Sequence, residues 1–559
     1  MSKNKIINKR FSKAFKLAFT SGLLFLMFAF VSPGEKYFEI AKNIDIFSTL
    51  FKEVNAYYVD EVEPKKLINT GIAAMLESLD PYTDYIPEES MEAFSIQTTG
   101  QYAGIGALIG IINNKTIVTE PYEGFSAFKG GIRVGDELIS IDGKNVESKP
   151  TAETSAMLKG KPNTPVVVVV KRLGQSNPIT FKLIREKIKI NNVSFASIIE
   201  HTIGFIKLDD FTPGAGKEVE QAVIKLKAQG ATSFILDLRN NPGGLLHEAV
   251  NTANVFIPKE KEIVSTKGKL QEWNKFYTTL NQPTDTQMPL VVLINGNSAS
   301  ASEIVAGSLQ DYDRAILIGQ KTFGKGLVQT TRQLPYNAQI KITTAKYYIP
   351  SGRCIQALDY AHRAKDGSVS KFADSVRAEY KTKGGRKVFD GSGLDPDIAV
   401  SPSDQSPLVS SLISSALIFE YASVFCGEHP TIPTSFINFK MNDVDYNKFV
   451  FWMKDKKISY PTEFEKQLTS LIESSKKEQI TVNFQNRLLA LKLKVEQNKA
   501  NDFQRFKDEI IEVLEQQIAF HYKLNKGLVE ASLKHDNEIA AAKKILIDST
   551  SYRKILLSQ

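Results

Sequence analysis

Leu290-Val291-Val292-Leu293-Ile294 is an unbroken apolar run, and Asn297-Ser298-Ala299-Ser300-Ala301-Ser302-Glu303 follows it after two residues. A run of this length without polar positions is typical of a strand buried on both faces. The alanines that flank Ser300 are small and leave its hydroxyl accessible. The segment therefore predicts a buried strand that leads into an accessible serine.

A second apolar run, Ala315–Gly319, is followed by Thr322-Phe323-Gly324-Lys325-Gly326. Glycines let the backbone approach closely, and a lysine held in a dry site can lose its proton and act as the general base for a serine. Ser300 and Lys325 together have the layout of a serine–lysine hydrolase. The sequence thus predicts an enzyme with Ser300 as nucleophile and Lys325 as base.

A third motif, Asp237-Leu238-Arg239-Asn240-Asn241-Pro242-Gly243-Gly244, follows the strand-like run Ser233–Leu236. Its simplest interpretation is a tight turn from a strand to a helix. The backbone N–H groups of Gly243 and Gly244, together with that of Ala301, would also form an oxyanion hole. Both interpretations stay open at this point.

Two other chemistries fit parts of this region. Residues Gly319–Gly326 match a phosphate-binding loop except that Gly326 replaces its last hydroxyl residue, and the following Leu327–Thr331 favours a strand where that loop needs a helix. His247 is the other candidate base for a serine, but its position is more typical of a packed or surface histidine. We therefore reject nucleotide binding and keep Lys325 as the base.

Length and charge limit the remaining possibilities. A chain of 559 residues is too long for one core and suggests about three or four domains. The net charge is +8, but six lysines and arginines lie before residue 17 and the remainder carries only +2, so no face for nucleic acid is expected. Cys354 and Cys426 are far apart and the histidines are scattered, so neither a metal nor another cofactor is expected.

The basic N-terminus precedes a short apolar run, Leu17–Val31, in the order of a secretory signal. No clean cleavage site follows this run, and a spanning helix usually needs about 17–25 apolar residues. Residues 1–34 are therefore predicted to be a signal peptide or signal anchor. The expected location is the periplasm or cell envelope, with anchoring to the inner membrane left open.

The rest of the chain falls into four regions that differ in their sequence patterns. Residues 35–98 have helical spacing, residues 99–190 are rich in β-formers and include the valine run Val166–Val170, residues 191–404 alternate strands and helices, and residues 405–559 are helical. In the last region, apolar residues from Phe503 to Tyr522 step by three or four, which predicts a helix with one apolar face. The predicted fold class is multidomain α+β: an α/β catalytic core with an inserted β-rich domain, an N-terminal helical segment and a C-terminal helical domain.

Taken in order, the segments 237–244, 298–311, 321–329 and 346–353 closely resemble the motifs of the carboxy-terminal processing peptidases, or tail-specific proteases, over roughly residues 40–400. The resemblance implies that Ser300 is the nucleophile, that Lys325 is the base and that Gln329 orients the lysine. Residues 99–190 are similar to the PDZ module of the family and are called the PDZ-like region below. Within it, Gly104, Ile105 and Gly106 match the start of the peptide-binding groove.

The resemblance implies an exported serine endopeptidase that recognises the C-terminal tails of proteins and cleaves through an acyl-enzyme without a cofactor. Arg133 is a candidate for coupling the PDZ-like region to the active site. The alternative is a non-catalytic PDZ scaffold that binds envelope proteins. An adaptor protein, a homo-oligomer and membrane anchoring through the N-terminus are left open.

Overall fold

The computed structural model describes residues 33–200, 202–372, 375, 377–402 and 405–557, and it divides into two compact units at Ser78. The predicted signal segment lies outside the described residues up to residue 32. The first unit holds two helices, α2 (Pro33–Tyr57) and α3 (Pro64–Glu77), as the helical spacing of this region predicts. Most of their apolar side chains are exposed, and Leu76 is the buried one among those described.

The second unit is organised around a six-stranded sheet in the order β10-β11-β12-β15-β16-β21. Its strands are β10 (Val193–Ile199), β11 (Ile203–Leu208), β12 (Ser233–Asp237), β15 (Leu290–Ile294), β16 (Ile316–Gly319) and β21 (Ile398–Ala399). All pairs are parallel except β10 with β11. Every residue of β12, β15 and β16 is buried, which confirms the strands predicted from the apolar runs.

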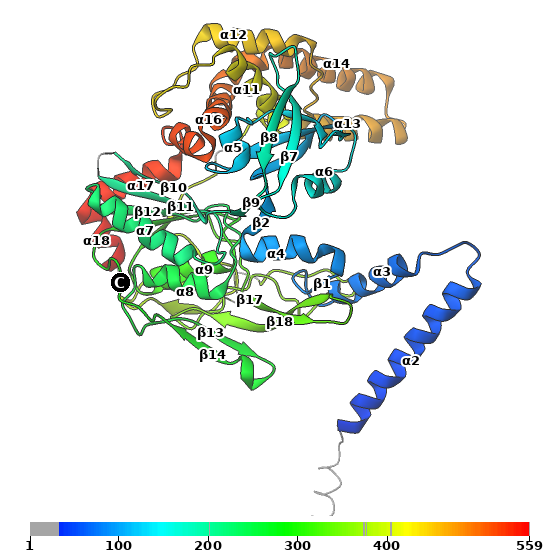
Figure 1. Ribbon diagram of the computed structural model, residues 1–559, viewed down its shortest axis with the longest axis vertical. Helices are drawn as coiled ribbons and strands as arrows, with labels where there is room; N and C mark the ends of the chain where they lie inside the picture. Colours follow the sequence, from blue (N-terminus) through cyan, green and yellow to red (C-terminus); the bar gives the residue numbers. More distant parts are fainter. Residues whose placement is uncertain (1–32, 201, 373–374, 376, 403–404, 558–559) are drawn as a thin grey trace, which may run out of the picture. The chain divides into compact units, whose positions relative to one another are not determined.

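Both faces of this sheet are covered by helices. One face packs against α7 (Ala215–Ala228), α8 (Leu246–Asn254) and α9 (Ala301–Asp311), and the other packs against α17 (Asn537–Ile547) and α18 (Ser549–Leu557). Side chains alternate along a strand, so Phe234 and Leu236 face the first group while Ile235 faces the second. The α/β core predicted for residues 191–404 thus receives part of its cover from residues near the end of the chain (Figure 1).

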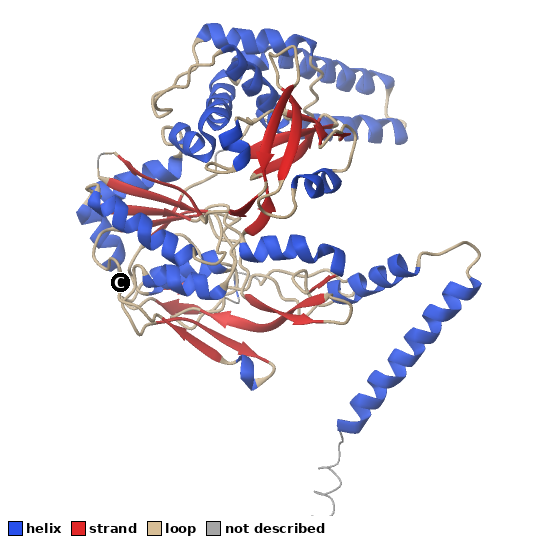
Figure 2. Ribbon diagram, in the orientation of Figure 1, coloured by secondary structure: helices blue, strands red, loops and turns tan. Residues whose placement is uncertain are grey.

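A second sheet lies beneath α8 and α9, so that these helices are sandwiched between two sheets (Figure 2). Its strands are β1 (Asp84–Ile86), β13 (Glu262–Gly268), β14 (Lys275–Thr278), β17 (Leu327–Gln333) and β18 (Gln339–Tyr348). Strand β17 directly follows Gly326, so the loop at 319–326 does not open a helix. A small hairpin, β19 (Glu379–Lys381) and β20 (Lys387–Phe389), follows.

The PDZ-like region forms a sheet in the order β3-β4-β5-β7-β8, with β6 paired to β5. Its elements are β2 (Gln101–Gly104), β3 (Ala107–Ile112), β4 (Lys115–Pro121), α5 (Ser126–Gly130), β5 (Glu137–Ile141), β6 (Lys144–Asn145), α6 (Thr151–Leu158), β7 (Pro165–Lys171), β8 (Ile179–Ile184) and β9 (Glu186–Lys189). Helix α4 (Met91–Thr99) leads into it, and β2 pairs with β9 where the chain enters and leaves. The valine run is a strand as predicted, but Val167 and Val169 are only half-buried because one face of β7 lies outside the core of this region.

Residues after 405 are helical, as predicted, and complete a multidomain α+β fold. The helices before α17 are α10 (Pro407–Ser414), α11 (Leu417–Glu428), α12 (Asp443–Trp452), α13 (Glu463–Lys477), α14 (Val482–Asn498), α15 (Asp502–Arg505) and α16 (Lys507–Ser532). The single helix predicted from Phe503 to Tyr522 is wrong in its first turn, because α15 ends before Phe506 and α16 begins after it. Cys354 and Cys426 are free thiols.

No single helix in the described part of the chain is long and apolar enough for a membrane span; α10 and α11 meet that requirement only as a pair bent by 69°.

Candidate active site

Ser300 stands between β15 and α9, at the carboxyl end of the central sheet, as the N-cap residue of α9. Its backbone has φ 55° and ψ −113°, which is strained for a residue with a side chain. Two contacts support this turn: the Ser300 N–H donates to the Glu303 carboxylate (2.8 Å), and the Tyr347 hydroxyl, which donates to the Lys325 carbonyl (2.6 Å), also lies 3.2 Å from the Ser300 carbonyl. A serine on such a sharp turn projects its hydroxyl away from the sheet.

Glu303 ties the serine turn to the lysine loop, and the sequence analysis did not single it out. Its carboxylate is fully buried and accepts four hydrogen bonds, from the Ser300 N–H (2.8 Å), the Thr322 hydroxyl (2.5 Å), the Gly324 N–H (2.8 Å) and the Lys325 N–H (2.9 Å). Burial raises the pKa of Glu303 to about 7, against the effect of these donors. The spacing of a serine N-cap and a glutamate three residues later is the signal that could have identified it.

Lys325 lies in the loop between β16 and β17. Burial lowers the pKa of Lys325 from its ordinary 10.5 to about 8, and the nearby charge of Lys341 lowers it further, while Asp80 and Glu303 act in the opposite direction. The lysine Nζ lies 4.4 Å from the centre of the Tyr82 ring. The depressed pKa is what a general base near neutral pH requires. Phe323, two residues before Lys325 in this loop, is 48% exposed and does not contribute to the burial of the lysine.

One cleft of about 660 Å³ brings the predicted catalytic and oxyanion residues together. Its lining includes Ser300, Lys325, Gln329, Gly243, Gly244 and Ala301. Among the described residues no hydrogen bond joins the Ser300 Oγ to the Lys325 Nζ, and the Gln329 amide donates to the Thr343 hydroxyl (3.0 Å). Catalytic hydrogen bonds often tighten only when substrate binds, so this arrangement is compatible with a resting site.

The glycines of the third motif approach the serine turn closely. Gly243 has φ +100°, and a Cβ added there would lie 2.8 Å from both the Ser300 Cβ and the Ala301 N. Its own N–H donates to Asn241 Oδ1 (2.9 Å). Within the described residues, the N–H groups of Gly244 and Ala301 have no such partner, so these two are the donors left for an oxyanion.

Helix α4 contributes a wall of the cleft that the sequence analysis missed. Phe94, Gln97 and Thr98 line the cleft together with the serine and lysine. Because α4 runs directly into β2 of the PDZ-like region, the chain that enters this region also touches the cleft. The sequence of α4 has no pattern that predicts its place at the cleft, because this place depends on how the regions of the chain pack together.

The predicted peptide-binding residues lie apart from the cleft, in the turn between β2 and β3. Ile105 is buried, and Gly106 has φ +76° with Phe125 so close that an added Cβ would lie 2.5 Å from the Phe125 Cβ. Strand β3 follows this turn and is an edge strand of its sheet. A free edge beside a glycine turn is able to accept an extended peptide.

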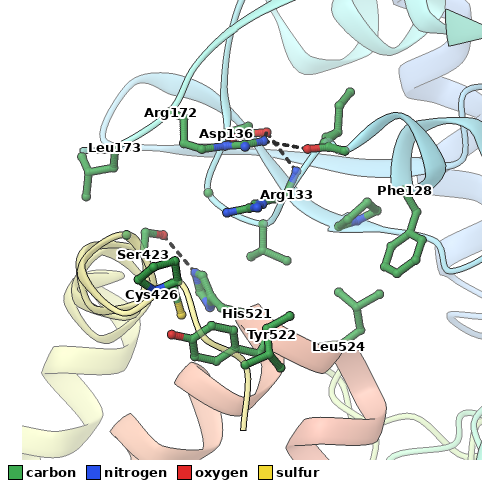
Figure 3. Close-up of a pocket in the computed structure, with 18 residues that line it drawn as sticks. Phe128, Arg133, Asp136, Arg172, Leu173, Ser423, Cys426, His521, Tyr522 and Leu524 are labelled. Carbon is green, nitrogen blue, oxygen red and sulfur yellow. Dashed lines mark hydrogen bonds and ion pairs between the residues drawn. The ribbon is translucent and has the colours of Figure 1, made fainter. Parts of the chain in front are cut away.

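Arg133 does not line the cleft of Ser300. It lies in a pocket of about 260 Å³ between the PDZ-like region and helices α11 and α16, facing Cys426 and Tyr522 (Figure 3). In this pocket His521 hydrogen-bonds to the Ser423 hydroxyl (2.9 Å), and burial lowers the pKa of His521 to about 4. The coupling role predicted for Arg133 stays a prediction. His247, the rejected base, is an exposed residue of α8.

Comparisons with known proteins give the following similarities. Three protein-family models match the chain: Peptidase family S41 over residues 202–362, a PDZ domain over residues 117–172, and the C-terminal helical domain of probable PDZ-proteases over residues 408–546. A carboxy-terminal-processing protease of Bartonella bacilliformis is 38% identical over 322 residues, which is 57% of this chain and 73% of that protein.

Two further similarities concern a curated protein and a solved structure. A probable CtpA-like serine protease of Staphylococcus aureus is 36% identical over 319 residues, which is 56% of this chain and 62% of that protein. The photosystem II D1 C-terminal processing protease is 26% identical, with a TM-score of 0.33 over 64% of this chain and 94% of that chain.

Proposed function

Because the chain belongs to the carboxy-terminal-processing proteases, which carry the peptidase family S41 domain, we propose that it hydrolyses peptide bonds through a Ser300–Lys325 dyad. The chain is a serine-type protease with a PDZ domain, and the resemblance drawn from its motifs is confirmed. The proposal covers three further points: which residues carry out the catalysis, that the protein recognises C-terminal tails, and that it is exported. Its main support is the cleft whose lining brings Ser300, Lys325 and the glycine pair together from separate segments of the chain.

In the proposed mechanism, Lys325 accepts the proton of the Ser300 hydroxyl as the serine oxygen attacks the scissile carbonyl. The carbonyl oxygen becomes an oxyanion, and the N–H groups of Gly244 and Ala301 stabilise it. Lys325 then gives the proton to the leaving amine, and an acyl-enzyme forms on Ser300. A water molecule, deprotonated by Lys325, releases the acyl group and restores the serine.

Gln329 is the third member of this proposed site. Its side chain lines the same cleft and its amide N–H is already held by Thr343. An amide fixed in this way presents its carbonyl oxygen in a defined direction, where it can accept a hydrogen bond from the lysine ammonium. Gln329 would therefore orient Lys325 rather than exchange protons itself.

We further propose that the PDZ domain selects substrates by their exposed C-terminal tails. The edge strand β3 would pair with the extended tail, and the turn at Gly104–Gly106 would bind its carboxylate with backbone N–H groups. The basic N-terminus and apolar run before residue 32 support export to the periplasm or envelope. Export is tested by cell fractionation, and a protein found only in the cytoplasm would contradict it.

The test of the dyad compares the purified full-length chain with Ser300→Ala, Lys325→Ala and the control Lys321→Ala. Lys321 is an exposed lysine of the same loop, paired with Asp395 (3.0 Å), and we expect its loss to leave turnover intact. The substrate is an unstructured protein with or without an apolar C-terminal tail, and mass spectrometry identifies the fragments. We expect tail-dependent cleavage that both active-site variants abolish.

Two results would contradict the proposal. A folded Lys325→Ala variant with wild-type turnover would exclude this lysine as the base. Tail binding without cleavage by the wild type would instead favour the non-catalytic PDZ scaffold, the alternative function for a chain with this domain.

A further inference from the structure

A short turn at residues 80–83 touches the lysine side of the proposed site from outside the cleft. Asp80 is buried and closes this turn: its Oδ1 accepts the N–H groups of Tyr82 and Thr83 (both 2.8 Å), and its Oδ2 accepts the Thr83 hydroxyl (3.1 Å). Strand β1 begins directly after the turn and pairs with β18, with Tyr85 opposite Ile340. An aspartate that binds its own following N–H groups makes a rigid turn.

The first contact of this turn is with the lysine. The Tyr82 ring lies under the Lys325 ammonium, with the Nζ 4.4 Å from the ring centre, a distance typical of a cation–π interaction. Tyr82 is itself supported by Tyr360, whose ring stands nearly perpendicular to it with the centroids 6.1 Å apart. Since a lysine side chain has four rotatable bonds, a fixed ring face restricts where its ammonium lies.

The second contact is with the glutamine. The Thr83 hydroxyl accepts the Thr343 N–H (3.2 Å) and lies 3.4 Å from the Thr343 hydroxyl. The same Thr343 hydroxyl accepts the Gln329 amide N–H (3.0 Å). One rigid turn is thus connected directly to Lys325 and, through Thr343, to Gln329.

We propose that the Asp80–Thr83 turn is a positioning element for the catalytic dyad, in which the Tyr82 ring aligns Lys325 and Thr83 fixes Gln329 through Thr343. This inference rests on the proposed function, because it requires Lys325 to be the base. None of these turn residues lines the cleft, so they act through Lys325 and Gln329 and not on the substrate. Position matters here because a displaced base costs up to about 100-fold in rate.

The matched variants are Tyr82→Leu, which removes the ring face, and Tyr82→Phe, which keeps it. For Tyr82→Leu we expect kcat to fall by about 10- to 100-fold with KM nearly unchanged. The ring favours the charged lysine, so its removal moves the midpoint of the kcat–pH profile to lower pH, by roughly 0.4–1.5 units for a cation–π interaction of ordinary strength. Tyr82→Phe retains both the rate and the midpoint.

The pH readout is specific because the groups around the ammonium are known. They are Tyr82 and Asp80 in the turn, Glu303 on α9 and Lys341 on β18, while the Tyr347 hydroxyl contacts the backbone carbonyl of Lys325 (2.6 Å). Only the first is changed in these variants. A second readout, the rate at which a fluorophosphonate labels Ser300 with loss of fluoride, reports the activation of the serine without tail recognition.

The outcomes separate this inference from the proposed function. If Lys325→Ala keeps full turnover, the proposed function fails. If Lys325→Ala is inactive while folded Tyr82→Leu keeps the wild-type kcat, labelling rate and pH midpoint, only the positioning role is refuted. Equal damage by Tyr82→Phe and Tyr82→Leu would also refute it, because the ring face would then be irrelevant.

Thermal unfolding checks that each variant is folded. Should Tyr82→Leu fail to fold, the pair Thr83→Val and Thr83→Ser decides the question, since valine removes the hydroxyl that serine retains. We expect Thr83→Val to lower kcat and Thr83→Ser to restore it. Wild-type kcat for Thr83→Val would overturn the role of the turn in fixing Gln329.

Discussion

Replacing Lys341 with methionine should move the pH dependence of the protease to higher pH. The pKa of Lys325 is about 8 against an ordinary value of 10.5, a difference of about 2.5 units, or ~3.4 kcal/mol. At pH 7 this leaves ~9% of the lysine neutral, compared with ~0.03% at the ordinary pKa. Burial is the larger cause and the Lys341 charge is the second, so we expect the pKa to rise by roughly 0.5–1 unit without it.

The assay is kcat against pH from about pH 6 to 10 with a tail-bearing substrate. Because only neutral Lys325 acts as a base, Lys341→Met should be about three- to tenfold slower than the wild type at pH 7 and equal to it well above pH 9. Lys346→Met is the matched control, since Lys346 is an exposed lysine of the same strand that does not line the cleft. Added salt should move the wild-type midpoint in the same direction as Lys341→Met, because it screens the repulsion.

An unchanged midpoint in Lys341→Met would refute this reasoning. So would an equal shift in Lys346→Met, which would mean that net charge rather than proximity sets the profile. A shift to lower pH would show that Lys341 favours the charged lysine, opposite to the electrostatics of the cleft.

Three further predictions concern the site and its support. Gly243→Ala should abolish turnover, measured as kcat, because the added Cβ would lie 2.8 Å from the Ser300 Cβ at a φ of +100°. Arg353→Met should lower the free energy of unfolding by about 3–5 kcal/mol in urea titrations, because it leaves the buried Asp311 without the partner now 2.8 Å away. The pKa of His521 is about 4 in the folded protein and 6.5 in the unfolded chain, so the unfolded chain binds the proton first as the pH falls. Between pH 7 and pH 5 the wild type should therefore lose about 2 kcal/mol of folding stability relative to His521→Gln, with the loss beginning below pH 6.5.

Each of these predictions has a control or a contradicting result. Gly143→Ala, with a φ of +75° and open space around it, carries the backbone strain without the clash and should remain active. Lys387→Met removes an exposed pair and should cost less than about 1 kcal/mol, so an equal loss in Arg353→Met would contradict the role of burial. Parallel stability–pH curves for the wild type and His521→Gln would show that this histidine does not titrate on unfolding.

The central sheet could be predicted from the sequence because its strands are buried on both faces. Strand β15 is apolar throughout, β16 has three apolar residues before Gly319, and β12 has three between Ser233 and Asp237, so each strand leaves a short apolar run as a local signal. The valine run of β7 gives the same signal, yet two of its valines are half-buried. An apolar run in the sequence predicts that a strand forms. It does not predict how deeply each face of the strand is buried, because segments far away in the sequence cover those faces.

Some residues of the candidate site could likewise be predicted from short motifs, and others could not. Ser300, Lys325 and the glycine pair stand in short motifs whose residue types suggest their chemistry. Tyr82 and Thr343 have no such motif. Tyr82 reaches the lysine from the turn before β1, which pairs with β18, and Thr343 lies opposite Gln329 where β18 pairs with β17. The half-buried His521 beside the PDZ-like region is likewise a product of packing between distant parts of the chain.

Helices α17 and α18 have a consequence for how the enzyme matures during synthesis. They cover one face of the central sheet, the Tyr552 hydroxyl bonds to both the N–H (2.9 Å) and the carbonyl (3.1 Å) of Leu290, and Arg239 of the glycine motif pairs with Asp536. On the ribosome these helices emerge after every residue of the cleft has been made. The sheet that carries Ser300 therefore keeps an uncovered apolar face until these two helices have been made, and a nascent chain remains without an assembled protease until they are released.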